Sequence, residues 1–149
     1  MSAFVTAGAG FLLAVLWFDL MFDVQVLGHG ERELPEEVLA SIAAYYRRVT
    51  TAARPMNRLI ATVMLATLAA IVVEIASGEE RTWVALLSLA LALPPIVLAG
   101  GRIVPRAVRL GTRVDPSERQ SALARSIFRE HVLCAGFIAA LLTVQLAFA

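Results

Sequence analysis

Four long runs of apolar residues constrain this chain more than any other feature of its sequence. They cover residues 2–27, 59–76, 83–101 and 132–149; the second carries one charge, Glu74, and the last two carry none. Each run is near the roughly 20 residues that a helix needs to cross about 30 Å of hydrocarbon. A hydrophobic share of 59% and a mean hydropathy of +0.76 exceed what a soluble domain of this size carries. The sequence therefore predicts an all-α integral membrane protein.

We expect one domain over residues 1–149, an antiparallel four-helix membrane bundle with extended third and fourth helices. The predicted spans are about residues 4–27, 57–76, 82–101 and 130–148. The first run is not expected to be a cleavable signal, because it lacks a basic start and acidic residues lie where a small-residue cleavage site would be.

The basic residues, all of them arginines, predict the orientation in the membrane. Only Arg81 lies in the second connection, whereas the other twelve of the 13 flank the first and third. By the positive-inside rule, these two connections lie in the cytoplasm and both termini lie outside it. The predicted location is the cell membrane, with several spans.

The first connection contains a predicted amphipathic helix at about residues 36–54, lying on the membrane or against the bundle. Pro35 followed by acidic residues is a favourable helix start. Arg47 and Arg48 are expected on the polar side of this helix. The 3.6-residue spacing places four residues on its buried face: Val38, Ile42, Tyr45 and Val49.

The third and fourth helices are predicted to extend into the cytoplasm. Pro94 and Pro95 should bend the third helix. If that helix persists, four arginines form one stripe along it: Arg102, Arg106, Arg109 and Arg113. Asp115 is predicted to cap a fourth helix that runs unbroken over residues 116–148, with proline at its first position.

Asp19 and Asp23 are the residues that most need an explanation, because they lie inside the first apolar run. At 1.5 Å per residue they would be about 12 Å and about 6 Å inside its end, and their spacing of four puts both on one helix face. Ionisable groups at such depth normally face the bundle and have a partner. We expect arginines as these partners, with Arg102 or Arg129 first.

The candidate site is therefore a cluster at the cytoplasmic level of the bundle. Three interpretations of this cluster are open: a structural ion-pair cluster, a ligand pocket that uses the same charges, and a proton or cation relay. Neither His29 nor His131 has a metal-ligand spacing, so both are expected to be solvated or capping side chains, and no metal is expected. The members of the cluster are Asp19, Asp23, Arg58, Arg102, Arg106, Arg129 and His131.

Two family resemblances accompany these patterns. The order WFDLMFDVQVLGHGE, YYRRVTTAARPM, GGRIVPRAVRL and a final helix resembles the small membrane-bound J-type protoporphyrinogen oxidases over nearly the whole chain. That resemblance implies the fold and a haem or other tetrapyrrole, but the family's histidine in the first helix and lysine in the third are absent from TAGAGF and VALLSL. The Val104-Pro105-Arg106 turn and Arg129-Glu130-His131 are similar to motifs of the anthrone-oxygenase-like membrane proteins.

The functional hypothesis is an integral membrane protein that binds an amphipathic anionic molecule at an Arg/Asp-lined mouth. The molecule would be a tetrapyrrole, a quinone-like compound or a lipid, and the cofactor is unknown. The alternatives are an accessory or assembly subunit of a larger membrane complex, and a small proton- or cation-coupled transporter. No catalytic residue is assigned, and as an enzyme the chain would be a membrane oxidoreductase. Expected partners are anionic lipid headgroups, further copies or a membrane complex, and no nucleic acid.

Overall fold

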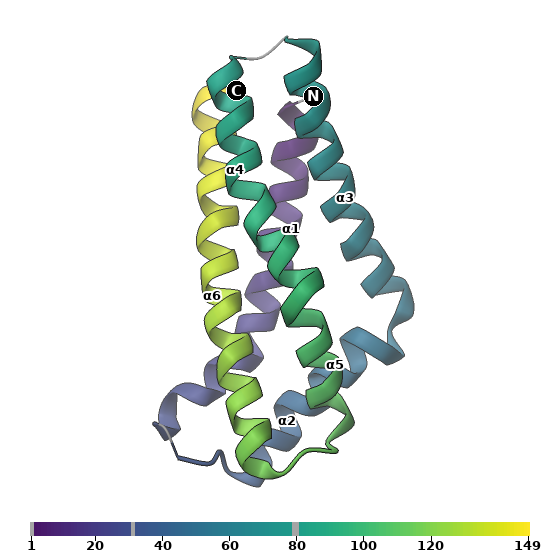
Figure 1. Ribbon diagram of the computed structural model, residues 1–149, viewed down its shortest axis with the longest axis vertical. Coiled ribbons are helices and arrows are strands. Elements are labelled where there is room, and N and C mark those ends of the chain that lie inside the picture. Colours follow the sequence, from purple (N-terminus) through teal and green to yellow (C-terminus); the bar gives the residue numbers. More distant parts are fainter. Residues whose placement is uncertain (1, 31, 79–80) are drawn as a thin grey trace.

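The computed structural model describes residues 2–30, 32–78 and 81–149 (Figure 1). Over these residues the chain forms helices and no strand. The elements in order are α1 (Ser2–Asp23), the 3₁₀ segment η1 (Val24–His29), α2 (Glu36–Arg47), the π-helical η2 (Arg48–Ala52), α3 (Arg54–Ser77), α4 (Thr82–Leu98), the π-helical η3 (Ala99–Ile103), α5 (Val104–Thr112) and α6 (Ser117–Phe148).

Four helical stretches are long and apolar enough to cross a membrane, as the sequence predicted. They cover Ser2–His29, Pro55–Ser77, Thr82–Thr112 and Ser117–Phe148, with hydropathy between 1.9 and 2.4 over their most apolar windows. α1 packs against α3 and α6, and α4 packs against the same two helices. Both termini, the end of α3 and the start of α4 lie at one end of the molecule, whereas α2 and α5 lie at the other, called here the α2–α5 end (Figure 1).

The third long helix continues past its prolines. Pro94 and Pro95 lie inside α4, and the chain passes through the π-helical η3 into α5. A proline has no N–H and displaces the preceding carbonyl, so a local change of helical hydrogen bonding nearby is expected. The stretch is helical as far as Thr112, and the arginine stripe lies along a continuous path.

The predicted cap of the fourth long helix is wrong. α6 begins at Ser117 with Pro116 as its N-cap residue, and no side chain caps it. Asp115 instead accepts two hydrogen bonds from Arg109, at 2.7 and 2.8 Å. A guanidinium that offers two parallel N–H donors satisfies a carboxylate better than a single backbone amide does.

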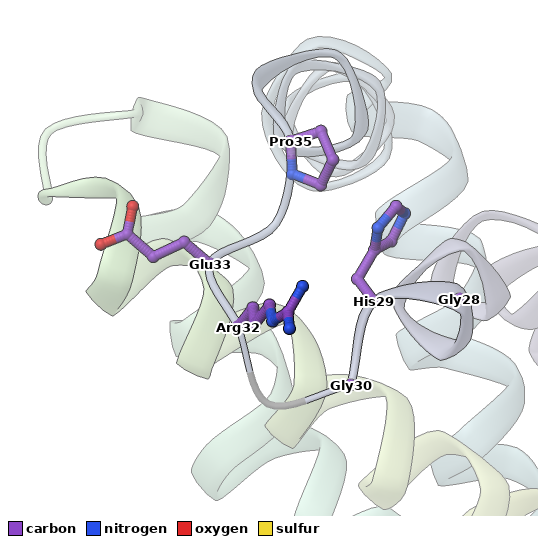
Figure 2. A pocket seen from close by; sticks show the side chains of 6 residues that line it. All are labelled: Gly28, His29, Gly30, Arg32, Glu33 and Pro35. Atoms are coloured by element: carbon purple, nitrogen blue, oxygen red, sulfur yellow. The ribbon is translucent and has the colours of Figure 1, made fainter.

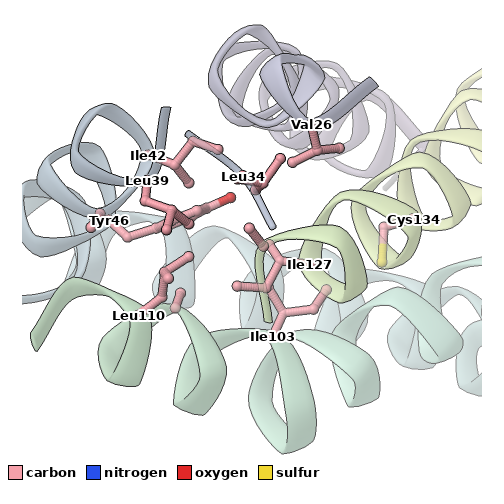
Figure 3. Close-up of a cluster of buried hydrophobic side chains, with 12 residues drawn as sticks. Val26, Leu34, Leu39, Ile42, Tyr46, Ile103, Leu110, Ile127 and Cys134 are labelled. Atoms are coloured by element: carbon pink, nitrogen blue, oxygen red, sulfur yellow. The ribbon is translucent and has the colours of Figure 1, made fainter. Parts of the chain in front are cut away.

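The buried face of α2 is centred one position away from the predicted one. Leu39, Ile42 and Tyr46 are fully buried, whereas Val38, Tyr45 and Val49 are only partly buried. They pack with residues of α5 and α6 in a core at the α2–α5 end (Figure 3). α2 lies against the other helices, and its backbone comes close to that of α5 at Gly111. A Cβ on this glycine would be 2.9 Å from the backbone nitrogen of Arg47, so the absence of a side chain allows the close approach. Arg47 and Arg48 are exposed, as expected.

Candidate functional site: a buried Asp–His–Tyr centre

Asp19 and Asp23 lie on the last turns of α1 and face inward, as their spacing predicted. The side chain of Asp23 is completely buried, and that of Asp19 is 15% exposed. Both carboxylates need hydrogen-bond donors, because the charged form of a carboxyl group is costly to remove from water.

His131 on α6 lies between the two carboxylates. Its Nδ1 is 2.6 Å from Oδ2 of Asp23, and its Nε2 is 3.9 Å from Oδ2 of Asp19. The imidazole is 6% exposed, so the expectation of a solvated or capping histidine is wrong for this residue. Asp23 fixes the ring orientation by accepting from Nδ1, which leaves Nε2 directed at Asp19.

The remaining donors come from two consecutive tyrosines of α2. Tyr45 donates to Oδ1 of Asp19 at 2.7 Å, and Tyr46 donates to Oδ1 of Asp23 at 2.5 Å. Tyr45 also stacks on Phe22 of α1, with ring centroids 4.1 Å apart. Burial, and then the nearby aspartates, raise the pKa of both phenols above its usual range, so that they stay protonated donors.

The prediction that arginines neutralise the two aspartates is wrong. Arg102 and Arg106 instead bind Oε1 of Glu130, at 3.3 and 2.6 Å, and Arg106 also donates to Ser126. The physical reason is the docking of α2, whose two tyrosines fill the space beside α1. Since each phenol supplies one donor at short range, no guanidinium is needed there.

The other predicted cluster members lie apart from this centre. Arg129 is exposed and donates to the backbone oxygen of Arg125. Arg58 is exposed on α3 and, among the described residues, has no hydrogen bond or ion pair. Farther along the stripe, Arg109 binds Asp115, which also pairs with Arg119 of α6, and Arg113 binds Glu36. The predicted cluster is therefore divided, and only Asp19, Asp23 and His131 meet.

Sequence reasoning missed the role of Tyr45 and Tyr46. The 3.6-residue spacing alone predicts only that Tyr45 lies on the apolar face of the amphipathic helix. The available signal was chemical, because a buried phenol needs a hydrogen-bond partner. The two carboxylates of α1 supply that partner for the two adjacent tyrosines of α2.

Two hollows lie outside the centre. One of about 460 Å³ is formed by the first connection and is lined by Gly28, His29, Gly30, Arg32, Glu33 and Pro35 (Figure 2). The other is an apolar groove of about 590 Å³ between α1 and α3. Its walls are Phe4, Ala7, Gly8 and Phe11 on α1, and Leu59, Val63, Ala66, Thr67, Ala69, Ala70 and Val73 on α3.

The histidines do not fit the role of haem ligands. Both ring nitrogens of His131 face carboxylates, and His29 lines the shallow hollow of the first connection. Comparison of the chain with family models, with curated proteins and with solved structures finds no match. The two family resemblances therefore stay predictions.

Proposed function

We propose that this chain is an integral membrane protein, an antiparallel bundle of four spanning helices with both termini outside the cytoplasm. The proposal is supported by the four long apolar helices and by the twelve arginines that flank the first and third connections. In this orientation the α2–α5 end is cytoplasmic, and α2, α5 and the first turns of α6 project beyond the hydrocarbon.

Its proposed function is to bind an anionic amphipathic molecule, with the apolar body in the α1–α3 groove and the anionic end at Arg58. The groove is the observation that carries this proposal. Its volume of about 590 Å³ lies within the roughly 300–1,000 Å³ of ligand sites. Small residues at Ala7, Gly8 and Ala66 leave the space, while Phe4 and Phe11 form walls.

The shape of the groove favours a chain-like apolar body. On α3 the lining residues extend from Leu59 to Val73, which corresponds to about 21 Å along the helix axis. The groove faces outward between two helices, where the bilayer would supply hydrocarbon chains directly. An acyl or isoprenoid chain fits this path better than a compact ring system.

Arg58 is the reason for proposing that the bound molecule is anionic. It directly precedes Leu59 at the cytoplasmic end of the groove, and it has no carboxylate partner among the described residues. By contrast, Glu130, Asp115 and Glu36 already neutralise the arginines of α5. The planar guanidinium binds a phosphate or carboxylate with two parallel hydrogen bonds.

Native mass spectrometry of protein extracted gently from its membrane tests this function. We expect a retained anionic amphiphile that is lost in Ala66→Phe, which fills the groove, and in Arg58→Gln. The matched controls are Ala61→Phe, an exposed residue of α3 outside the lining, and Arg129→Gln. Equal loss in the controls would contradict the proposal. A stoichiometric protein in place of the amphiphile would favour the accessory-subunit alternative.

A further inference from the structure

The Asp–His–Tyr centre has no part in the proposed amphiphile site, yet it holds a fully buried carboxylate, Asp23, beside a nearly buried imidazole, His131. It joins three helices: the carboxylates belong to α1, the phenols to α2 and the imidazole to α6. Two carboxylates in one buried place are costly unless a cation offsets part of their charge, because buried unpaired charges are strongly destabilising.

The charge balance depends on one proton. With a neutral imidazole, two buried carboxylates would share two phenol donors and one ring N–H, and the centre would carry two negative charges. A protonated imidazole has an N–H on each ring nitrogen. One nitrogen lies 2.6 Å from Asp23 and the other 3.9 Å from Asp19, so each would face a carboxylate oxygen.

We propose that Asp19, His131 and Asp23 form a proton-binding site, and that the proton held by the imidazole controls the docking of α2 on α1 and α6. While the proton is bound, the imidazolium offsets one carboxylate and both phenols keep their acceptors. When it leaves, Asp19 and Asp23 repel each other on one helix face, and water must enter to solvate them. Tyr45 and Tyr46 are the contacts through which that change reaches α2.

The groups that face the imidazole come from every helix packed around it. α1 contributes the two aspartates and α2 the two tyrosines. On α6 the neighbouring Glu130 is held by Arg102 and Arg106, so its charge is already offset. No guanidinium contacts Asp19 or Asp23 among the residues described, and the imidazolium is therefore the cation that matters for these carboxylates.

The first test is the ¹⁵N chemical shift of both ring nitrogens of His131 in detergent micelles, followed with pH. We expect two protonated nitrogens at neutral pH and the loss of the Nε2 proton when the pH is raised. His29 provides a second imidazole signal for comparison in the same sample, because it lines the hollow of the first connection and not this centre. A single protonated nitrogen on His131 at neutral pH would overturn the proposal.

The second test measures the docking of α2. A spin label at Ala44, an exposed position of α2, is introduced after Cys134→Ala, and a label at Ala122 on α6 is the control. We expect the Ala44 label to become mobile over the pH interval in which His131 loses its proton, with no change at Ala122. If the mobility of the Ala44 label does not change with the protonation of His131, the proposed coupling between the proton and the docking of α2 is contradicted.

Variants separate the proton from the packing. Asp19→Asn keeps the imidazole and Asp23 but removes one carboxylate. The loss of the His131 proton and the mobility change of the Ala44 label should therefore move together to lower pH. His131→Gln should abolish the pH-dependent step at Ala44. Tyr45→Phe retains every charge and should leave the protonation of His131 in place while loosening α2 at all pH values. If the mobility change of the Ala44 label occurs at the same pH in Asp19→Asn as in the unchanged protein, the proposed proton-binding site is refuted. This outcome can be read whether or not the His131 variant folds.

Discussion

The imidazole of His131 and the carboxylate of Asp23 are 108 residues apart in the chain, and their Nδ1 and Oδ2 atoms lie 2.6 Å apart. This contact joins the end of α1 to the middle of α6. The same carboxylate also accepts from Tyr46, so α2 is held at the same point. The first connection is thus fixed to the bundle by polar contacts as well as by its apolar face.

The two aspartates should contribute unequally to stability. Asp23→Asn removes the charged acceptor of both His131 and Tyr46 in a fully buried place, and we expect a loss of about 3–5 kcal/mol. Asp19→Asn should cost clearly less, because Asp19 is partly exposed and lies 3.9 Å from the imidazole. Thermal unfolding in detergent measures the difference, and equal losses would contradict the unequal burial of the two carboxylates.

Arg106 should couple to Glu130 and not to Asp19. In a double-mutant cycle, Glu130→Gln and Arg106→Gln are expected to show an interaction free energy on the order of 1 kcal/mol, since their side chains are 2.6 Å apart. The cycle of Asp19→Asn with Arg106→Gln is the control and should be additive. An interaction free energy in the control cycle would instead support the sequence-based prediction that an arginine pairs with Asp19.

Tyrosine ionisation should occur only after α2 leaves the centre or the chain unfolds. The chain contains two tyrosines, Tyr45 and Tyr46, so the tyrosinate absorbance reports on the centre alone. Unfolded phenols ionise near pH 10, whereas the folded pKa of both is raised. The stability gained from neutral phenols is therefore complete below about pH 10 and is lost as the pH rises further. Tyrosinate absorbance that appears at pH 10 while a spin label at Ala44 still reports a docked α2 would disprove this.

Gly111 should tolerate no side chain. A Cβ there would lie 2.9 Å from the backbone nitrogen and 3.1 Å from the Cα of Arg47, so α2 and α5 would have to separate. We expect Gly111→Ala to cost about 1–3 kcal/mol. Gly136→Ala on α6 is the matched control, because a Cβ at that position meets no atom within 4 Å. Thermal unfolding of both variants, compared with the unchanged protein, measures the effect.

The proposed orientation can be tested by labelling single cysteines in sealed cells, after Cys134→Ala. A cysteine at Ser117, an exposed residue at the start of α6, should resist an impermeant reagent, because the proposed orientation places the α2–α5 end in the cytoplasm. A cysteine at Ala149 should react under the same conditions. The reverse pattern would show that the arginine distribution does not set the topology.

The sequence by itself determined the helices. The four apolar runs and the start of α6 near Pro116 follow from composition and helix-start signals, which act within a few residues of the chain. The inward direction of Asp19 and Asp23 followed in the same way. Burial cost alone requires it, whatever their partners are.

Only the tertiary structure decided which donors meet those carboxylates. Arginines, a histidine and two tyrosines all occur in the segments beside the apolar runs, and their local sequence patterns do not rank them as donors. The choice depends on the docking of α2, which is set by the close backbone approach at Gly111 and by the packing of Leu39, Ile42 and Tyr46. A partner chosen by contacts between residues far apart in the chain is not encoded in any single segment, because each segment's periodicity specifies a face and not the neighbour that covers it.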